Sequence, residues 1–136
     1  MKAGFTGTQI GMSLNQVEKL KKVLTRLGVT ELHHGDCIGA DAQAHEVCLA
    51  AGIDIVIHPP VDGRKRAYCD IQPHTLSVVT TKVRRPYLDR NHDIVDDTDM
   101  LIAAPKDEKT EELRSGTWAT IRYAEKKFRI IAILDR

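Results

Sequence analysis

The sequence has no apolar run long enough to cross a membrane. No stretch of it approaches the roughly 20 apolar residues that a transmembrane helix needs. The segment 1–6 turns polar too soon to supply the apolar core of a signal peptide. These absences predict a cytoplasmic protein that does not engage a membrane.

Cysteine is scarce, and neither cysteine nor histidine is arranged in a ligand motif. The three cysteines, Cys37, Cys48 and Cys69, are odd in number and lack CxxC spacing, which argues against a disulfide framework or a zinc ribbon. The six histidines form no HExxH or comparable pattern. The sequence therefore predicts no metal and no cofactor, and Cys48, on an apolar helix face, is expected to be a buried small hydrophobe.

Neither sign of charge is in excess. The net charge is +1, with 20 basic and 19 acidic residues, whereas proteins that coat nucleic acid usually carry a clear basic surplus. We therefore expect no nucleic-acid partner. The basic residues are local: 64–66, 84–85, Arg90 and Arg114. Local cations suit a few phosphates. Solvated loop charge is a simpler interpretation for 64–66 and 84–85 than for Arg90 and Arg114.

Short apolar strands alternate along the chain with amphipathic helices. One helix opens at a capping box of Ser13 and Gln16 and stops at Gly28, and a second ends at Gly52. Further helices are expected over 88–97 and 117–127, with a loop and one short helix over 61–75. Strands are expected over 2–5, 29–34, 53–58, 100–104 and 129–134, with a weaker one over 76–80.

This alternation predicts an α/β fold. We expect a Rossmann-like, doubly wound, mostly parallel sheet of about five strands with helices on both faces. No internal repeat, low-complexity tract or linker interrupts residues 1–136, which are expected to form a single domain.

In such a sheet the ligand binds outside the carboxyl ends of the strands. Glycines there let backbone N–H groups approach a ligand, and hydroxyl side chains add directional donors. Asp36 and Asp41 are the candidate catalytic carboxylates or ribose contacts, although both could merely cap turns. The candidate ligand-binding residues in the first three turns are Thr6, Gly7, Thr8, Gln9, Gly35, Asp36, Gly39, Ala40, Asp41 and His58.

Two later segments add candidate phosphate contacts. Arg114, Ser115, Gly116 and Thr117 combine a cation, two hydroxyls and a glycine where a helix begins, which is the composition of a phosphate-binding turn. A simple N-cap and turn explain Ser115 to Thr117 equally well. Arg90 and Asn91 lie early in their helix and can reach the same crevice, whereas Trp118 is expected to belong to the core.

The ordered set of turns resembles the SLOG superfamily. This superfamily includes the Lonely Guy phosphoribohydrolases, the DNA-processing protein DprA and relatives of the bacterial protein YpsA. The resemblance spans almost the whole chain and implies a Rossmann-like domain that binds nucleotides, nucleotide sugars or related signals. It implies that Arg90–Asn91 and Ser115–Thr117 hold phosphate. It is carried by these segments: 4–8, 34–41, 89–91, 99–105 and 114–117.

One departure from the family pattern bears on catalysis. Lonely Guy enzymes carry a catalytic glutamate in a GTxxE motif, and this chain has Thr120 at that position. We therefore expect a sensor, carrier or sequestering protein for a phosphorylated nucleotide, nucleotide sugar or ADP-ribose-type signal. The alternative is a nucleotide N-glycosidase whose carboxylate has moved to Asp36 or Asp41. The relatives also imply a homo-oligomer, a dimer or higher.

Overall fold

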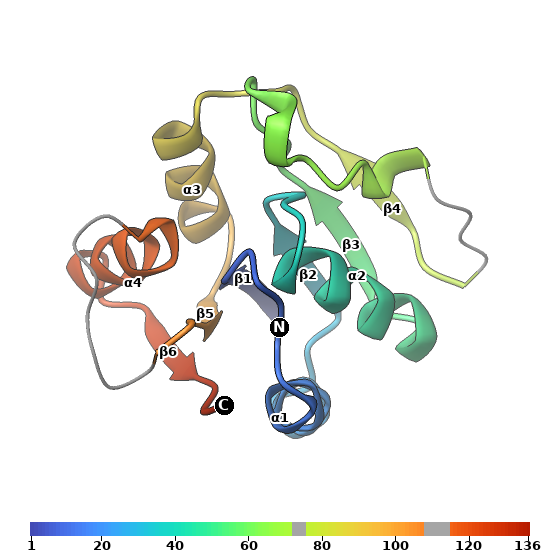
Figure 1. Cartoon of the computed structure of the whole chain (residues 1–136). Helices are drawn as coiled ribbons and strands as arrows, with labels where there is room; N and C mark the ends of the chain where they lie inside the picture. Colours follow the sequence, from blue (N-terminus) through green and yellow to red (C-terminus); the bar gives the residue numbers. More distant parts are fainter. Residues whose placement is uncertain (72–75, 108–114) are drawn as a thin grey trace.

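The computed structural model describes residues 1–71, 76–107 and 115–136, and its centre is a six-stranded parallel sheet (Figure 1). The strand order is β4-β3-β2-β1-β5-β6. The chain therefore builds outward from β1 to β4 and then returns to the other side of β1. The strands are β1 (Lys2–Gly7), β2 (Glu31–His34), β3 (Asp54–Ile57), β4 (Val79–Thr81), β5 (Met100–Ala104) and β6 (Ile130–Ile133).

Helices cover both faces of this sheet. Helices α1 (Leu14–Arg26) and α2 (Ala40–Ala51) lie on one face, and α3 (Tyr87–Asp96) and α4 (Gly116–Lys126) lie on the other (Figure 1). Two short 3-10 helices, η1 (Gly63–Lys65) and η2 (Cys69–Ile71), follow β3. None of the described helices is long and apolar enough to cross a membrane.

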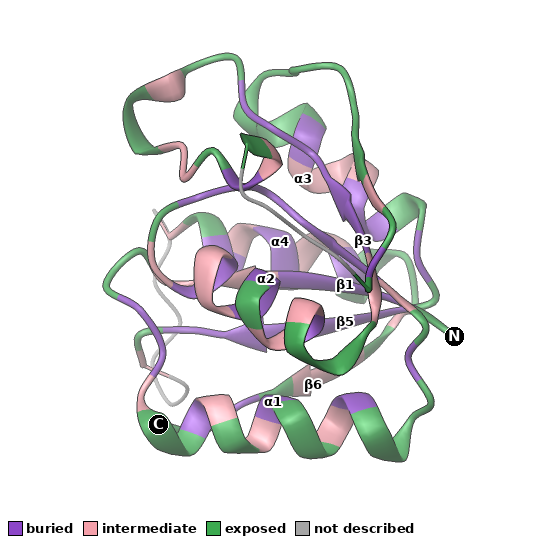
Figure 2. Ribbon diagram, turned by 90° about the vertical axis from the view of Figure 1, so that its right-hand side faces the viewer, coloured by how far each residue is buried: buried purple, intermediate pink, exposed green. Residues whose placement is uncertain are grey.

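The core forms because the strands are apolar on both sides. Figure 2 shows β1 and β5 buried between the helical layers. Phe5, Leu32 and Ile102 pack with Leu20 of α1 on one face. On the other face Leu101 packs among residues of α3 and α4, and Trp118 belongs to this group with 9% of its surface exposed. The predicted α/β, doubly wound sheet is confirmed, as are the core positions of Cys48 and Trp118.

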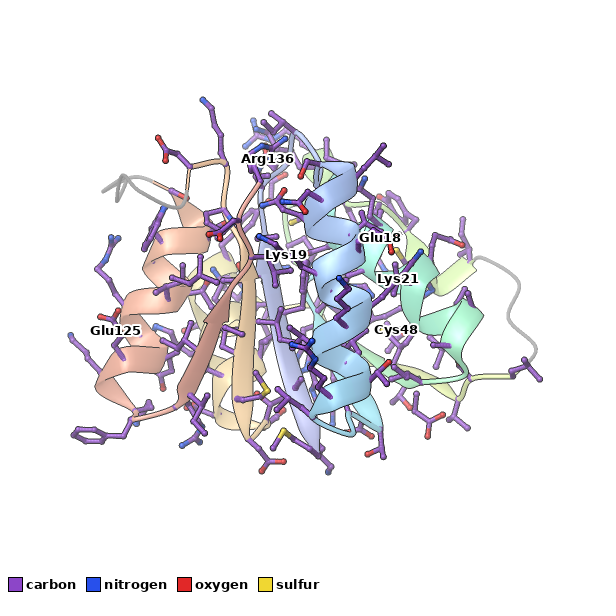
Figure 3. All side chains as sticks on the ribbon, turned by 90° about the horizontal axis from the view of Figure 1, so that it is seen from below. Glu18, Lys19, Lys21, Cys48, Glu125 and Arg136 are labelled. Atoms are coloured by element: carbon purple, nitrogen blue, oxygen red, sulfur yellow. The ribbon has the colours of Figure 1, made fainter. Side chains whose placement is uncertain are left out.

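The start of α1 also follows from the sequence. The Ser13 side chain accepts from the Gln16 backbone N–H, and the Gln16 side chain accepts from the Ser13 backbone N–H, as the capping box predicts. The Gln16 amide in turn donates to the backbone oxygen of Leu134, at 3.0 Å. This end of α1 therefore lies against the C-terminal segment, where Lys19 also pairs with Asp135 (Figure 3).

The sheet differs from the expectation mainly at β4. It has six strands rather than about five, because the weak segment does pair, in parallel with β3. The paired residues begin at Val79, three residues later than expected, and the preceding Val78 N–H donates to the Asp54 carboxylate instead. The described part of the loop after β3, up to residue 71, contains two 3-10 helices rather than one.

Candidate functional site

A cavity of about 300 Å³ opens at the carboxyl ends of the strands. It lies beside β1 and β5, where the direction of strand addition reverses, which is the expected ligand position in an open α/β sheet. The N-terminal residues of α3 and α4 reach it. It is lined by Phe5, Thr6, Gly7, Thr8, Gln9, Ile10, Gly35, Cys37, Asp41, Tyr87, Arg90, Asn91, Ile94, Lys106, Ser115, Gly116 and Thr117.

The turn after β1 supplies the wall closest to the sheet. The Thr8 N–H donates to the Ala104 oxygen at 3.0 Å, which extends the β1–β5 pairing by one residue. The Thr8 oxygen accepts from the Ala40 N–H at 3.0 Å. These bonds fix the turn between β5 and α2, so the predicted residues Thr6 to Gln9 all lie along the cavity.

Gly39 and Ala40 shape the cavity from behind rather than lining it. Gly39 has φ +87°, and a Cβ atom there would collide with the backbone of Gln9. A Cβ atom at Gly7 would collide with the Cβ of Ala40. Small residues at these positions let the first turn pack against the start of α2, so their role in the structure is close packing.

Arg90 is the central charged group of the cavity. Only 3% of its surface is exposed, and its Nη1 donates to the backbone oxygens of Gly35 and His58, the latter at 3.1 Å. Its Nε donates to the Asn91 side chain at 2.8 Å. Its Nη2 lies 3.7 Å from the Cys37 sulfur. Within the described part of the chain no direct ion pair joins Arg90 to a carboxylate, and its hydrogen bonds go to neutral groups.

The Arg90 guanidinium also explains why residue 35 is a glycine. A Cβ atom at residue 35 would overlap the Arg90 side chain. Tyr87 lies on the other side, with its ring centre 4.8 Å from the Arg90 guanidinium carbon. The predicted pair Arg90–Asn91 therefore reaches the same cavity as Gly35, as the sequence indicated.

Asp41 places a second charged group in the cavity wall. Its Oδ2 accepts from the Cys37 N–H at 3.2 Å, whereas its Oδ1 is buried and has no hydrogen-bond partner among the described residues. Burial raises the pKa of Asp41 from 3.8 to about 6, and the positive charge of Arg90 opposes that rise. A buried carboxyl with a displaced pKa and an unused oxygen is a typical feature of a functional site.

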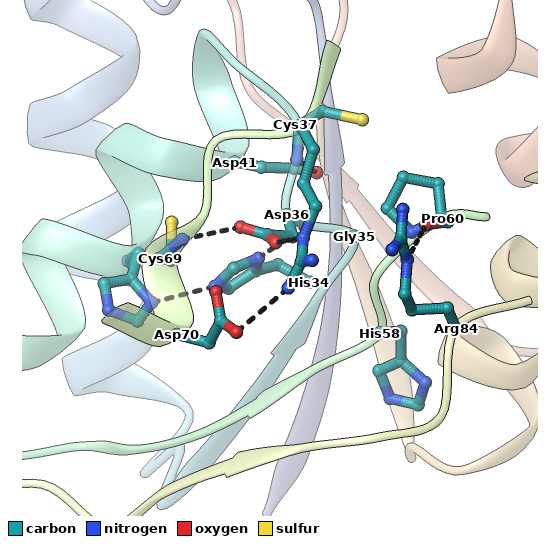
Figure 4. Close-up of polar contacts among 12 residues, drawn as sticks. His34, Gly35, Asp36, Cys37, Asp41, His58, Pro60, Cys69, Asp70 and Arg84 are labelled. Atoms are coloured by element: carbon teal, nitrogen blue, oxygen red, sulfur yellow. Dashed lines mark hydrogen bonds and ion pairs between the residues drawn. The ribbon is translucent and has the colours of Figure 1, made fainter. Parts of the chain in front are cut away.

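Asp36, the other candidate carboxylate, faces away from the cavity. Its Oδ2 accepts from Arg66 Nε at 2.6 Å and its Oδ1 accepts from the Cys69 N–H at 2.9 Å (Figure 4). Asp36 itself has φ +58°. Both oxygens are therefore used to hold the segment after β3 against the β2 turn, and among the two candidates Asp41 alone lines the cavity.

The start of α4 serves the helix and the cavity at once. Ser115 is the N-cap, and its hydroxyl accepts from the Trp118 N–H at 3.3 Å. Ser115, Gly116 and Thr117 also line the cavity, so the two alternative interpretations of this turn are compatible. Arg114 lies outside the described residues.

Thr120, at the family's glutamate position, is buried inside α4. Its hydroxyl donates to the Gly116 backbone oxygen at 2.9 Å, and 1% of its surface is exposed. It does not line the cavity. In this chain the position therefore contributes a helix-internal hydrogen bond.

The structure places His58 beside the cavity rather than in its lining. The His58 backbone oxygen accepts from Arg90, but its ring faces His33, at 2.8 Å between the two nitrogens. His45 lies 2.9 Å from His34 in the core beneath α2.

Several lining residues were not found from the sequence. Phe5, Ile10 and Ile94 read as ordinary apolar positions. Cys37 and Tyr87 lie next to predicted site residues, and the Cys37 sulfur is 3.8 Å from the Tyr87 hydroxyl. Burial raises the pKa of Cys37. Cys37 and Tyr87 could have been predicted from their positions next to other site residues in the sequence. Their residue types alone did not indicate a ligand site.

Comparison with known proteins supports the architecture. No protein-family model matches the sequence, and no curated protein matches it significantly. Among solved structures, DNA processing protein A (DprA) from Streptococcus pneumoniae is similar, with a TM-score of 0.70 and 20% identity over 97% of this chain. The match covers 49% of that protein.

Two smaller proteins have the same architecture. The molybdenum cofactor binding protein from Rippkaea orientalis has a TM-score of 0.67 at 15% identity, over 97% of this chain and 74% of that one. The Moco carrier protein from Chlamydomonas reinhardtii has a TM-score of 0.60 at 17% identity, over 98% and 75%. The chain therefore has a Rossmann-like fold, which it shares with DprA, one of the proteins that its turns resemble.

Proposed function

We propose that the chain binds a phosphorylated nucleotide, nucleotide sugar or ADP-ribose-type molecule in the cavity, as a sensor, carrier or sequestering protein. One observation carries the proposal: Arg90 is a buried cation at the cavity wall, and among the described residues all its hydrogen bonds go to neutral groups. A buried charge without a direct ion pair is costly, and an anionic ligand would supply that pair.

The surroundings of Arg90 favour phosphate as the anion. Thr8, Ser115 and Thr117 line the cavity with hydroxyl groups, and α4 starts at Gly116 in the same wall. A helix N-terminus presents unpaired N–H groups and a favourable dipole to an anion. The cavity volume is at the small end of the ~300–1,000 Å³ typical of ligand sites.

A carrier role accords with the names of two similar structures. One is a molybdenum cofactor binding protein and the other a Moco carrier protein. Those names describe the other proteins. For this chain the two names favour binding without turnover. The presence of Thr120 at the position of the family's catalytic glutamate favours the same conclusion.

Calorimetry with matched ligands tests the proposal. AMP, ADP, ADP-ribose and cyclic ADP-ribose are each compared with adenosine, which lacks phosphate. Arg90→Lys keeps the charge but loses the planar fork, so it should weaken phosphate-ligand binding by about 10- to 100-fold. Arg64→Gln, which removes an exposed guanidinium outside the cavity, is the control and should bind normally.

A second variant guards against damage to the fold. Thr8→Val removes one lining hydroxyl and should weaken binding several-fold while the circular dichroism spectrum stays unchanged. Absence of binding by every phosphorylated ligand at millimolar concentration would refute the proposal. Equal affinity for adenosine and AMP would refute the phosphate assignment.

A specific observation favours one alternative, a nucleotide N-glycosidase. Asp41 has a buried, unpartnered oxygen and a pKa of about 6, and glycosidic cleavage needs a carboxyl that can exchange a proton or stabilise a cationic sugar. Asp36 is engaged with Arg66 and Cys69, so Asp41 is the better candidate for this role.

Chromatography of nucleotide digests separates the two functions. Release of free base that Asp41→Asn abolishes, and that Asp36→Asn does not abolish in a folded variant, would support the enzyme. Binding without release of base would leave the carrier or sensor role. The cytoplasmic location, the homo-oligomer and the absence of nucleic-acid binding stay predictions from the sequence.

A further inference from the structure

Among the described residues, two groups of side chains that could hold a metal ion lie outside the cavity lining. In each group, one candidate ligand atom from every residue lies within 4.8 Å of the others. They belong to opposite faces of the sheet, because residues 33 and 34 are neighbours on β2 and their side chains alternate. The first group is His34, His45 and Cys69, and the second is His33, His58 and Asp97.

The first group is arranged for its own hydrogen bonds. The Asp36 N–H donates to His34 Nδ1 at 3.0 Å, so neutral His34 carries its proton on Nε2. That nitrogen lies 2.9 Å from His45 Nδ1 and donates to it. Nε2 of His34 therefore has no lone pair for a metal, and all three residues are fully buried.

The second group has the opposite arrangement of protons. His33 Nε2 lies 2.9 Å from the Glu31 carboxylate, which can only accept, so the proton of neutral His33 is on Nε2. Its Nδ1 presents a lone pair to His58 Nε2, at 2.8 Å. The ring centres are 5.1 Å apart, so the two nitrogens lie almost on the line that joins the rings. A histidine that donates its second N–H to a carboxylate is the usual form of a metal ligand.

The surroundings allow a cation to reach this pair. His33 and His58 are 4% and 3% exposed, but Asp97 is exposed and gives access from solvent.

We propose that His33, His58 and Asp97 form a binding site for a divalent transition-metal ion of the Zn²⁺ class, with Glu31 orienting His33. Imidazole nitrogens with a carboxylate oxygen are a ligand set that zinc accepts. The hydrogen bond between the two histidines is the metal-free form. Binding moves the His58 proton to Nδ1, turns both rings so that their lone pairs converge on the ion, and separates the two nitrogens to roughly 3.3 Å, as two ligands of tetrahedral zinc require.

The site is separate from the cavity but adjoins it through one residue. The backbone oxygen of His58 accepts from Arg90, whereas its ring belongs to the metal ligands. Metal binding and phosphate-ligand binding can therefore be measured independently of each other.

Metal titration of the full chain tests this site. Chelator-treated protein should bind one equivalent of Zn²⁺ or Co²⁺, measured by elemental analysis after equilibrium dialysis. His58→Gln should lower the affinity by about 100-fold or more, and Glu31→Gln by about 10-fold, the lower end of the effect of outer-shell partners. Asp97→Asn should also lower the affinity for the metal. Because Asp97 is exposed, this variant tests the ligand set without disturbing the core. His92→Gln, a histidine in neither group that stacks on Tyr123, is the control.

Three outcomes would overturn the proposal. The first is no uptake of either metal at micromolar concentration. The second is uptake that survives His58→Gln and Asp97→Asn but is lost with His45→Gln or Cys69→Ser, which would assign the metal to the first group. The third is a sulfur-to-cobalt charge-transfer band, because the proposed ligands contain no thiolate.

Discussion

Replacement of Asp41 by asparagine should make the protein's stability less sensitive to pH. The folded pKa of Asp41 is about 6, above the ordinary 3.8. The folded state therefore holds this proton more tightly than the unfolded state does. The contribution of Asp41 is fully favourable below about pH 4 and is lost as the pH rises through 6.

The size of this effect follows from the pKa difference. A rise of about two units corresponds to about 3 kcal/mol in the free energy of unfolding. Between pH 4 and pH 7.5 we expect the wild type to lose about 2 to 3 kcal/mol relative to Asp41→Asn. The asparagine oxygen can still accept from the Cys37 N–H, and any cost of its buried amide group is independent of pH, so it cancels in this difference.

Urea unfolding at pH 4, 5, 6 and 7.5 measures this difference. The fluorescence of Trp118, the single tryptophan, reports unfolding. Asp89→Asn, which changes an exposed carboxylate of α3, is the control and should follow the wild type. If the stability difference between wild type and Asp41→Asn is the same at pH 4 and pH 7.5, Asp41 has no raised pKa and its assignment as the poised carboxyl fails.

Three further perturbations test the packing around the site. Gly39→Ala should lower the free energy of unfolding by about 1–3 kcal/mol, because residue 39 has a positive φ and a Cβ atom there would collide with the first turn. Gly28→Ala is the control, because Gly28 also has a positive φ but has open space around it. An equal loss for both variants in urea unfolding would contradict the prediction. Arg66→Gln should cost about 3–5 kcal/mol in the same assay, because it leaves the fully buried Asp36 carboxylate uncompensated; a loss below about 1 kcal/mol would show that solvent reaches the pair. The NMR resonances of the His58 ring should stay those of the neutral form down to about pH 4, and a midpoint near 6.5 would refute its burial.

The sequence by itself determined the layers of the fold and the turns that reach the ligand edge. Local rules were sufficient where the signal lies within one segment. The capping box of Ser13 and Gln16 starts α1, and the apolar run 100–104 makes a central strand. Because the carboxyl ends of parallel strands share one edge, the sequence predicted that the turns carrying Thr8, Gly39, Arg90 and Gly116 converge. Three of these residues line the cavity, and Gly39 packs behind it.

Tertiary structure decided which of two similar residues faces the cavity. Asp36 and Asp41 flank the same turn and could not be told apart by type. Asp36 has a left-handed backbone and pairs with Arg66, thirty residues away. These two features turn the Asp36 carboxylate toward the loop after β3 and leave the Asp41 carboxylate at the cavity. The pairing of His33 with His58 likewise depends on the register of β2 beside β3, which no local pattern encodes. Hydrogen bonds and ion pairs between distant segments are set by packing, and they become visible only when the chain is folded.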